Sequence, residues 1–364
     1  MRRWLSDSLF EQRWQSWVVA VLVLSIAKYG VGLLPSWQYM QALAIHWRDP
    51  HSSPFLQPPD DFRLRSPVSA VAAGWLHLTG NSQFVGFHLV LALVAVVLPL
   101  IMPRVRRSAE LRALVGLLIL GGAIPPILLS WIGSYDPVSI GAAAVAALAV
   151  RREVAALGWM VFAFNNAPEA ALGFAALAVV LLVDQGRLAL PRLIMGGVGG
   201  VAGYVGMRVL DNVWGGGTGE GTLVHFYGFH RYTSSAEHFW PLIILSALGV
   251  GWLMVSSPEA WRLPAVRVFA ALSVLFGFGI PLLALDETRI TAGALWAPLL
   301  AVATIVARQL RIDEVRAITV RIAPPALLIV VVVVWDGSLV YPGWSGLANM
   351  ARYLTGQLPM PPSL

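Results

Sequence analysis

Residues 17 to 34 have the sequence WVVAVLVLSIAKYGVGLL, in which Lys28 is the single charged side chain. About 20 apolar residues in a helix cross a hydrocarbon core about 30 Å thick, so this run predicts a transmembrane helix. Similar runs recur through the 364 residues, of which 57% are hydrophobic and 12% charged, with a mean hydropathy of +0.72. These properties exclude an ordinary soluble domain and predict an all-α polytopic membrane protein.

The apolar runs predict about eleven transmembrane helices, within a range of about ten to twelve. The two middle runs are shorter than a full span, and the run at 193–210 is rich in glycine, which allows neighbouring helices to approach closely. The predicted spans are 17–35, 83–102, 113–132, 138–150, 154–167, a run that ends at 183, 193–210, 239–255, 268–285, 290–307 and 322–340.

The distribution of arginine predicts the orientation of these spans. Arg2, Arg3 and Arg13 precede the first run, and arginine recurs in alternate connections after it, which places the N-terminus and those connections in the cytoplasm. An odd number of spans then places the C-terminus outside. All seven histidines fall in segments assigned to the outer side. We expect one transmembrane domain over residues 1–364.

Three outward segments follow from this topology. Residues 37–80 form a first extracytoplasmic loop that ends in a short interfacial helix at 67–79, with Ser66 as its cap and Pro67 in its first turn. Residues 211–238 form a second large loop, and residues 341–364 form an outer tail.

Basic residues and cysteine restrict the function further. Lys28 is the only lysine, and we expect it near the outer end of its span with its ammonium group reaching toward the interface. The arginines are explained by topology and lipid headgroups, so no nucleic-acid partner is predicted. The absence of cysteine excludes disulfides, thiolate metal sites and a cysteine nucleophile. We expect no cleavable signal peptide.

Residues 46–65, HWRDPHSSPFLQPPDDFRLR, are the most polar part of the first outer loop. Asp49, Asp60 and Asp61 are its candidate catalytic residues, since a carboxylate can act as general base toward an acceptor hydroxyl or bind a metal ion. Adjacent residues of an extended chain point to opposite sides, so Asp60 and Asp61 are not expected to share one role.

Arginines of the same loop give this segment a second interpretation. Arg63 and Arg65 are candidates for binding an anionic substrate. The alternative is an exposed acidic loop in which Arg48, Arg63 and Arg65 simply pair with the three aspartates.

Other candidate substrate-binding residues lie in later outward connections. Asp136 precedes a short helix. It can bind a substrate, or it can simply cap that helix. Asn166 and Glu169 lie between two apolar segments, where a carboxylate is costly unless it faces protein or water. They are expected to line a cavity or to cap the next helix.

Two further connections supply cations. Arg289 is a candidate for binding phosphate through a two-pronged guanidinium contact, and the alternative is an internal ion pair with Asp286. His230 and Arg231 are candidates for binding a sugar phosphate. The spacing of the histidines in this loop matches no strong metal motif. The cofactor is therefore left unknown, with a divalent metal such as Mg or Mn as the candidate.

This layout resembles the GT-C superfamily of membrane glycosyltransferases. The resemblance rests on the span at 17–35, the outer loop with Asp49, Asp60 and Asp61, and the interfacial helix at 67–79. Residues 60–65, DDFRLR, are also similar to an acidic–aromatic–Leu–Arg pattern in the first loops of oligosaccharyltransferases. The chain lacks a large soluble C-terminal domain and a WWD motif, so protein N-glycosylation is not supported.

The resemblance implies a polyprenyl-phosphate sugar as donor and a glycan or lipid outside the cytoplasm as acceptor. An outer-loop aspartate would act as base, and Arg289 or another outer arginine would stabilise the departing phosphate. The implied partners are the lipid-linked donor and membrane lipids, and the implied location is a bacterial cytoplasmic membrane. Two alternatives remain: a transporter or flippase of lipid-linked sugars, and a non-catalytic subunit of a membrane complex.

Overall fold

The computed structural model describes residues 10–33, 37–53, 56, 66–214, 240–280, 287–335, 338–340, 351–352 and 355. Within these residues the chain is almost entirely helical, apart from one small antiparallel pair of strands. The first half contains α2 (Trp14–Tyr29), α3 (Trp37–Ile45), the 3-10 turn η1 (Pro50–Ser52), α4 (Val68–Trp75), α5 (Asn81–Ile101), α6 (Pro103–Arg106), α7 (Ala109–Leu120), α8 (Ile124–Ser130) and α9 (Asp136–Leu148).

The second half continues this pattern of helices joined by short connections. It contains α10 (Arg152–Asn165), α11 (Ala167–Gln185), the 3-10 turn η3 (Gly186–Ala189), α12 (Leu190–Val213), helical residues 240–248, α14 (Gly251–Val255), α15 (Pro258–Trp261), α16 (Pro264–Gly279), α17 (Glu287–Gln309), α18 (Ile312–Leu328), β1 (Val333–Trp335) and β2 (Ser338–Val340).

The helices confirm an all-α protein of the membrane type. Three helical stretches in the described residues are long and apolar enough to cross a bilayer, namely 81–101, 167–213 and 288–309, and a bent pair at 109–130 makes a fourth. The stretch at 167–213 contains both α11 and α12. By this measure of length and composition the described residues do not reach the predicted count of eleven, because several apolar helices are too short.

Several predicted boundaries were wrong, each for a local reason. The first span was expected to reach residue 35, but α2 ends at Tyr29, because Gly30 adopts a left-handed φ of 69° and ends the helix. Residues 31–33 continue as extended chain, and Leu33 forms a parallel bridge with Ile132.

The last predicted span, 322–340, was also wrong. Helix α18 ends at Leu328, after Pro324 and Pro325 have removed two backbone donors. The valine-rich segment that follows turns into strand β1. Branched side chains favour extended chain, so this apolar run is not a helix.

Two other predicted spans are interrupted inside the bundle. Helices α7 and α8 occupy the span predicted at 113–132 but meet at an angle of 52° around Gly121 and Gly122. The span predicted at 239–255 is broken at Gly249, which has a φ of 52°. The two breaks touch, since the Val250 amide donates to the carbonyl of Gly121 at 2.9 Å.

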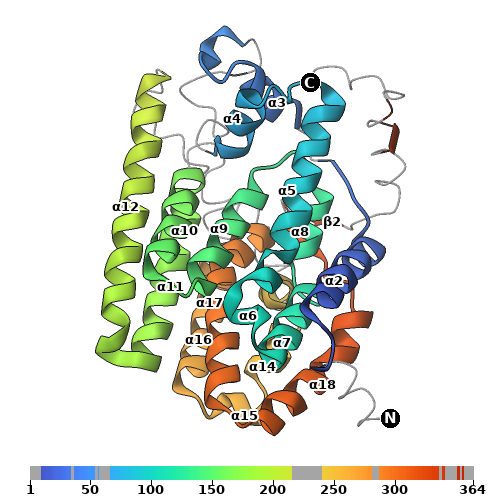
Figure 1. Cartoon of the computed structure of the whole chain (residues 1–364), viewed down its shortest axis with the longest axis vertical. Helices are drawn as coiled ribbons and strands as arrows, with labels where there is room; N and C mark the ends of the chain where they lie inside the picture. Colours follow the sequence, from blue (N-terminus) through green and yellow to red (C-terminus); the bar gives the residue numbers. More distant parts are fainter. Residues whose placement is uncertain are drawn as a thin grey trace.

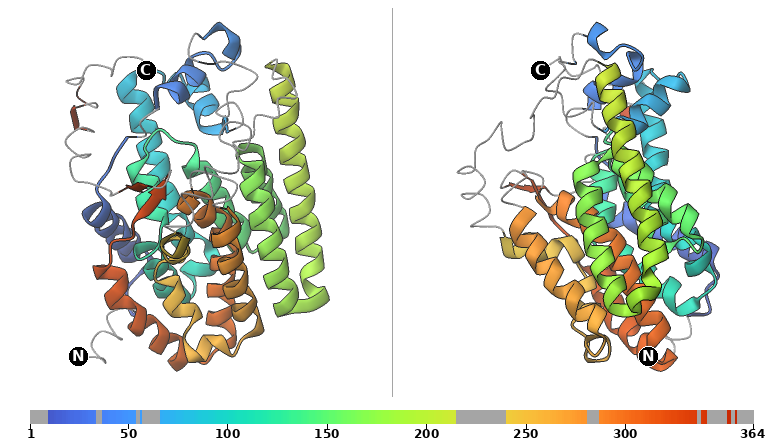
Figure 2. Two further views of the ribbon diagram at one scale, coloured as in Figure 1. Left: turned by 180° about the vertical axis from the view of Figure 1, so that it is seen from behind. Right: turned by 90° about the vertical axis from the view of Figure 1, so that its left-hand side faces the viewer.

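Glycines set the spacing between helices α10 and α12. A Cβ at Gly199 would lie 2.2 Å from the carbonyl oxygen of Ala156, and one at Gly203 would lie 2.1 Å from that of Met160. Helix α12 therefore packs directly on the backbone of α10, as the glycine content of this segment predicted. Figures 1 and 2 show the two helices side by side along most of α10.

The bundle has two different ends. Helices α3 and α4 lie at one end, whereas α15 and the start of α18 lie at the other (Figure 1). Arginine is concentrated in the connections α5–α7, α9–α10, α11–α12, α14–α16 and α17–α18. We call these five connections the arginine-rich face.

Candidate functional site

Three connections bring buried polar side chains together beneath helix α4. These are the turn before α9, the α10–α11 junction and the first turn of α17. Apart from the partly buried Tyr135 these side chains are buried, and Arg289 comes from a segment more than 100 residues further along the chain. We call this group the Arg289 cluster; it consists of Ser134, Tyr135, Asp136, Asn165, Glu169 and Arg289.

A buried ion pair lies at the centre of the cluster. Arg289 Nη1 donates to Asp136 Oδ1 at 2.8 Å and to the hydroxyl of Tyr135 at 2.8 Å. The guanidinium carbon also lies 5.1 Å from the centre of the Tyr135 ring. The side chains of Arg289 and Asp136 are only 10% and 3% exposed. A charge removed from water this completely is tolerated because it is both paired and hydrogen-bonded.

Asp136 is held on both of its carboxylate oxygens. The hydroxyl of Ser134 donates to Oδ2 at 2.9 Å, and the Asp136 amide donates back to that hydroxyl at 3.2 Å. Asp136 is also the first residue of α9, where the helix dipole favours a negative charge. Its carboxylate does not cap α9 through a hydrogen bond in the described contacts, so the simple capping hypothesis does not account for it.

Asn165 links three elements through one amide side chain. Its Nδ2 donates to the Tyr135 carbonyl at 3.1 Å and to the Ser139 hydroxyl at 2.9 Å, while its Oδ1 accepts from the Val68 amide at 3.3 Å. Ser66 was predicted to cap α4, and this was wrong: α4 has no side-chain cap of its own. The cap comes instead from Asn165, on another helix, which fastens α4 over the cluster.

Glu169 enters the cluster from the first turn of α11. Asn166 caps this helix by accepting a hydrogen bond from the Glu169 amide at 3.3 Å. Glu169 is only 4% exposed. Its carboxylate faces α17, since a Cβ at Gly293 would lie 2.7 Å from its Oε2. Gly293 is one helical turn after Arg289, so Glu169 and Asp136 approach the same face of α17.

An apolar groove of about 290 Å³ adjoins the cluster. Val68, whose amide binds Asn165, and Phe164, which precedes Asn165, both line this groove. The full lining comes from α4, α10 and α12 and consists of Pro67, Val68, Val71, Ala72, Trp75, Phe164 and Leu210.

The remaining predicted site residues are Asp49 and a set that lies outside the described residues. Asp49 is exposed and lies at the start of the turn η1, where only its backbone makes hydrogen bonds within the described residues. Arg289 pairs with Asp136 among the described residues, and its predicted pairing with Asp286 concerns a residue outside them. Other predicted residues lie outside the described residues: Asp60, Asp61, Arg63, Arg65, His230, Arg231 and Asp286.

Lys28 has a role that the sequence interpretation missed. Its ammonium group was expected to reach the interface, but it donates to the carbonyls of Leu120 at 2.7 Å and Ala326 at 2.8 Å. The hydroxyl of Tyr29 donates to the same Leu120 carbonyl at 3.2 Å. We call this group the Lys28 junction. The available signal was the position of a lone lysine inside an apolar run, which is costly unless the charge has partners.

The carbonyls at the Lys28 junction need a donor because their helices stop there. Leu120 is the last residue of α7, and Ala326 belongs to the last turn of α18. The last carbonyls of a helix have no intrahelical partner and carry a partial negative charge. Lys28 therefore stabilises two helix ends at once.

No three His, Asp or Glu side chains lie together as a metal site among the residues that the structure describes. No protein-family model, curated protein or solved structure matches this chain. The chemistry of the site therefore has to be inferred from its residues.

Proposed function

We propose that this chain is a membrane transferase that moves a sugar from a polyprenyl-phosphate donor to a glycan or lipid acceptor outside the cytoplasm. One observation supports it above the others: the Arg289 cluster lies beside an apolar groove under helix α4. A prenyl chain fits an apolar groove, and a phosphate head fits a neighbouring guanidinium.

In this proposal the acceptor hydroxyl attacks the anomeric carbon of the donor. The bond between that carbon and the phosphate oxygen breaks, the hydroxyl proton passes to a carboxylate, and the lipid phosphate leaves with the negative charge. One of the outer-loop aspartates, Asp49, Asp60 or Asp61, serves as the base. Asp60 and Asp61 precede Val68 by only eight and seven residues in the chain.

Arg289 stabilises the departing phosphate in this reaction. Its Nη1 group donates to both Asp136 and Tyr135. Because Asp136 and Tyr135 orient the group in advance, it stabilises a departing phosphate without first having to reorganise.

Transfer of radiolabelled sugar by purified protein tests the proposal directly. The wild type is compared with Asp49→Ala, Asp60→Ala, Asp61→Ala and Arg289→Lys, the last of which keeps the buried charge. We expect one aspartate variant to lose about 100-fold or more in turnover, as removal of a general base does. Full activity in all four variants contradicts the site, and folded wild type that transfers from no donor contradicts the transferase.

The orientation belongs to the same proposal: the N-terminus and the arginine-rich face lie in the cytoplasm, and the location is a bacterial cytoplasmic membrane. The chain has no cysteine, so single cysteines report sidedness cleanly. Trp75 and Leu188 are 68% and 85% exposed at opposite ends. A membrane-impermeant thiol reagent should label Trp75→Cys in intact cells, and Leu188→Cys only after permeabilisation. The reverse pattern contradicts the orientation.

A transporter or flippase of lipid-linked sugars is the second candidate, and the interrupted helices favour it. Transporter sites are often built where broken helices meet near the bilayer midplane. Here the breaks at Gly121 and Gly249 touch each other, and Lys28 binds beside them. Reconstitution with a fluorescent lipid-linked sugar separates the two functions, since a flippase moves the label across the bilayer without breaking the sugar–phosphate bond.

A further inference from the structure

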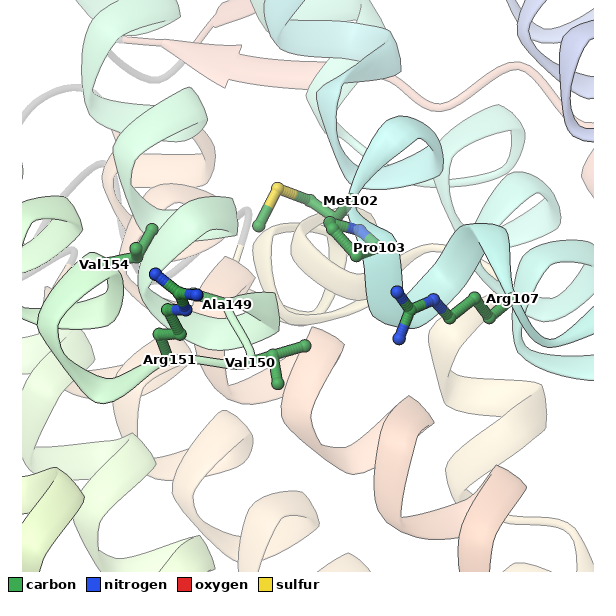
Figure 3. A pocket seen from close by; sticks show the side chains of 7 residues that line it. All are labelled: Met102, Pro103, Arg107, Ala149, Val150, Arg151 and Val154. Atoms are coloured by element: carbon green, nitrogen blue, oxygen red, sulfur yellow. The ribbon is translucent and has the colours of Figure 1, made fainter.

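A second pocket lies on the arginine-rich face, away from the Arg289 cluster. It has a volume of about 300 Å³ and is formed where the end of α5 and α6 meet the turn between α9 and α10. Its lining combines apolar side chains with two arginines and consists of Met102, Pro103, Arg107, Ala149, Val150, Arg151 and Val154. Figure 3 shows Arg107 and Arg151 on opposite sides, with Met102, Pro103 and Val150 between them.

Neither guanidinium at this pocket is neutralised by a direct contact with another described residue. Within the part of the chain that the structure describes, the side chains of Arg107 and Arg151 make no hydrogen bond or ion pair. Glu153 is the carboxylate whose charge reaches Arg151, but it is bound to Arg152 at 3.1 Å and is 60% exposed. Most other arginines of this face do have partners, for example Arg308 with Asp184 and Arg316 with Glu110.

Further arginines make the surroundings of the pocket more positive. Arg104 is close enough to Arg192 and to Arg308 for their charges to repel each other. Arg192 donates to the carbonyls of Ala146 and Ala147 at 2.8 Å each, so the end of α9 is already stabilised. Arg151 follows that helix end, but its side chain makes no hydrogen bond there within the described residues.

The walls of the pocket are as informative as its charges. Val150 and Val154 are 59% and 38% exposed, although both are apolar. Exposed valines beside cationic groups suit a molecule with a hydrocarbon part and an anionic part. Phospholipids of the inner leaflet have this chemistry, and basic pockets between transmembrane helices bind their headgroups.

We propose that the pocket between Arg107 and Arg151 is a specific binding site for an anionic phospholipid, with the phosphate between the two guanidinium groups and an acyl chain along Val150 and Val154. Two guanidinium groups match a phosphate diester by charge and by hydrogen-bond geometry. The site is independent of the Arg289 cluster and of the transferase reaction.

Thermal unfolding of the purified chain in neutral detergent tests the proposal. The additives are dihexanoyl phosphatidylglycerol, dihexanoyl phosphatidylcholine and glycerol 3-phosphate, which separate charge, chain and free phosphate. We expect the anionic lipid alone to raise the melting temperature in a saturable way. In Arg107→Gln/Arg151→Gln the half-saturating concentration should rise on the order of tenfold, because each arginine contributes to anionic-lipid affinity.

A matched variant separates a site from general surface charge. Arg187 and Arg267 are exposed on the same face and, like the pocket arginines, have no side-chain partner within the described residues. Arg187→Gln/Arg267→Gln should keep the response of the wild type. Equal loss in both double variants, an equal response to phosphatidylcholine, or an equal response to glycerol 3-phosphate would each overturn the proposal.

Discussion

The Arg289 cluster and the Lys28 junction each hold a cation inside the helical bundle, but they neutralise it by different means. Arg289 is almost fully buried and binds the carboxylate of Asp136 and the hydroxyl of Tyr135. Lys28 is half-buried, and its hydrogen-bond partners among the described residues are two backbone carbonyls, those of Leu120 and Ala326. One cation is balanced by a full charge, and the other by the partial charges of two helix ends.

This difference separates what each centre does for the fold. At the Arg289 cluster two full charges form a buried pair, so removing either one is strongly destabilising. At the Lys28 junction the acceptors are neutral carbonyls at helix ends, so removing the lysine takes away hydrogen bonds but leaves no uncompensated charge. The first centre should therefore be more sensitive to single substitutions.

Breaking the ion pair tests this comparison with the largest expected effect. We expect Asp136→Asn to lower the free energy of unfolding by about 3–5 kcal/mol, because Arg289 then keeps its charge in a buried site. Reversible unfolding in detergent measures the change. The double variant Asp136→Leu/Arg289→Met removes both charges and should recover most of the loss.

A second pair on the surface is the control for that experiment. Arg152 and Glu153 have the same chemistry at 3.1 Å, but their side chains are 58% and 60% exposed. Glu153→Gln should leave the free energy of unfolding nearly unchanged, because both charges are solvated. If Asp136→Asn costs no more than Glu153→Gln, the Arg289 cluster is not the buried electrostatic centre described above.

Removing the lysine should have the next largest effect. Lys28→Met loses two hydrogen bonds from a charged donor, and we expect a cost of about 2–3 kcal/mol. Tyr29→Phe loses one neutral hydrogen bond to the same Leu120 carbonyl and should cost about 1 kcal/mol. Equal costs for the two variants would show that the charge of Lys28 contributes nothing beyond an ordinary hydrogen bond.

The Asn165 amide gives a smaller effect that is localised on one helix. Asn165→Ala loses the cap of α4 and two hydrogen bonds to the segment at 135–139, and we expect a cost of about 1–2 kcal/mol. Hydrogen exchange of the variant should show its largest increase in rate at the backbone amides of α4. Unchanged exchange at α4 would contradict the role of Asn165 in fastening this helix.

The sequence allowed good prediction of elements whose signals are local. The short helices α9 and α10, the interfacial helix α4 and the glycine-rich α12 lie close to their predicted positions. Asp136, Glu169 and Arg289 were each chosen as outward polar residues in apolar surroundings, which is a local signal as well. Their assembly was not predicted, because Asp136 and Arg289 are separated by 153 residues.

The wrong predictions for Lys28 and Ser66 have a common physical cause. The sequence does not show which backbone carbonyls and amides are available for side chains in the folded chain. Lys28 binds carbonyls that become available only because α7 and α18 end where they do. The cap on α4 comes from a different helix, so the neighbouring Ser66 was the wrong choice. In both cases the partner is set by the tertiary fold.

The smallest effect is expected where the same guanidinium–carboxylate chemistry lies at the surface. Arg321 donates to both oxygens of Glu259 at 3.2 Å and joins α15 to α18. This hydrogen bond lowers the pKa of Glu259 from its ordinary value of 4.5. The ionised carboxylate therefore stabilises the fold above pH 4.5, and this contribution is lost as the pH falls through the lowered pKa.

Because the pair is partly accessible to water, its contribution should be less than about 1 kcal/mol. Melting curves of the wild type and of Glu259→Gln between pH 7 and pH 3 measure it. The stabilities should differ at pH 7 and converge in acid. A difference that persists at low pH, or one as large as that for Asp136→Asn, would show that burial does not explain why the Arg289 pair matters more than its exposed counterpart.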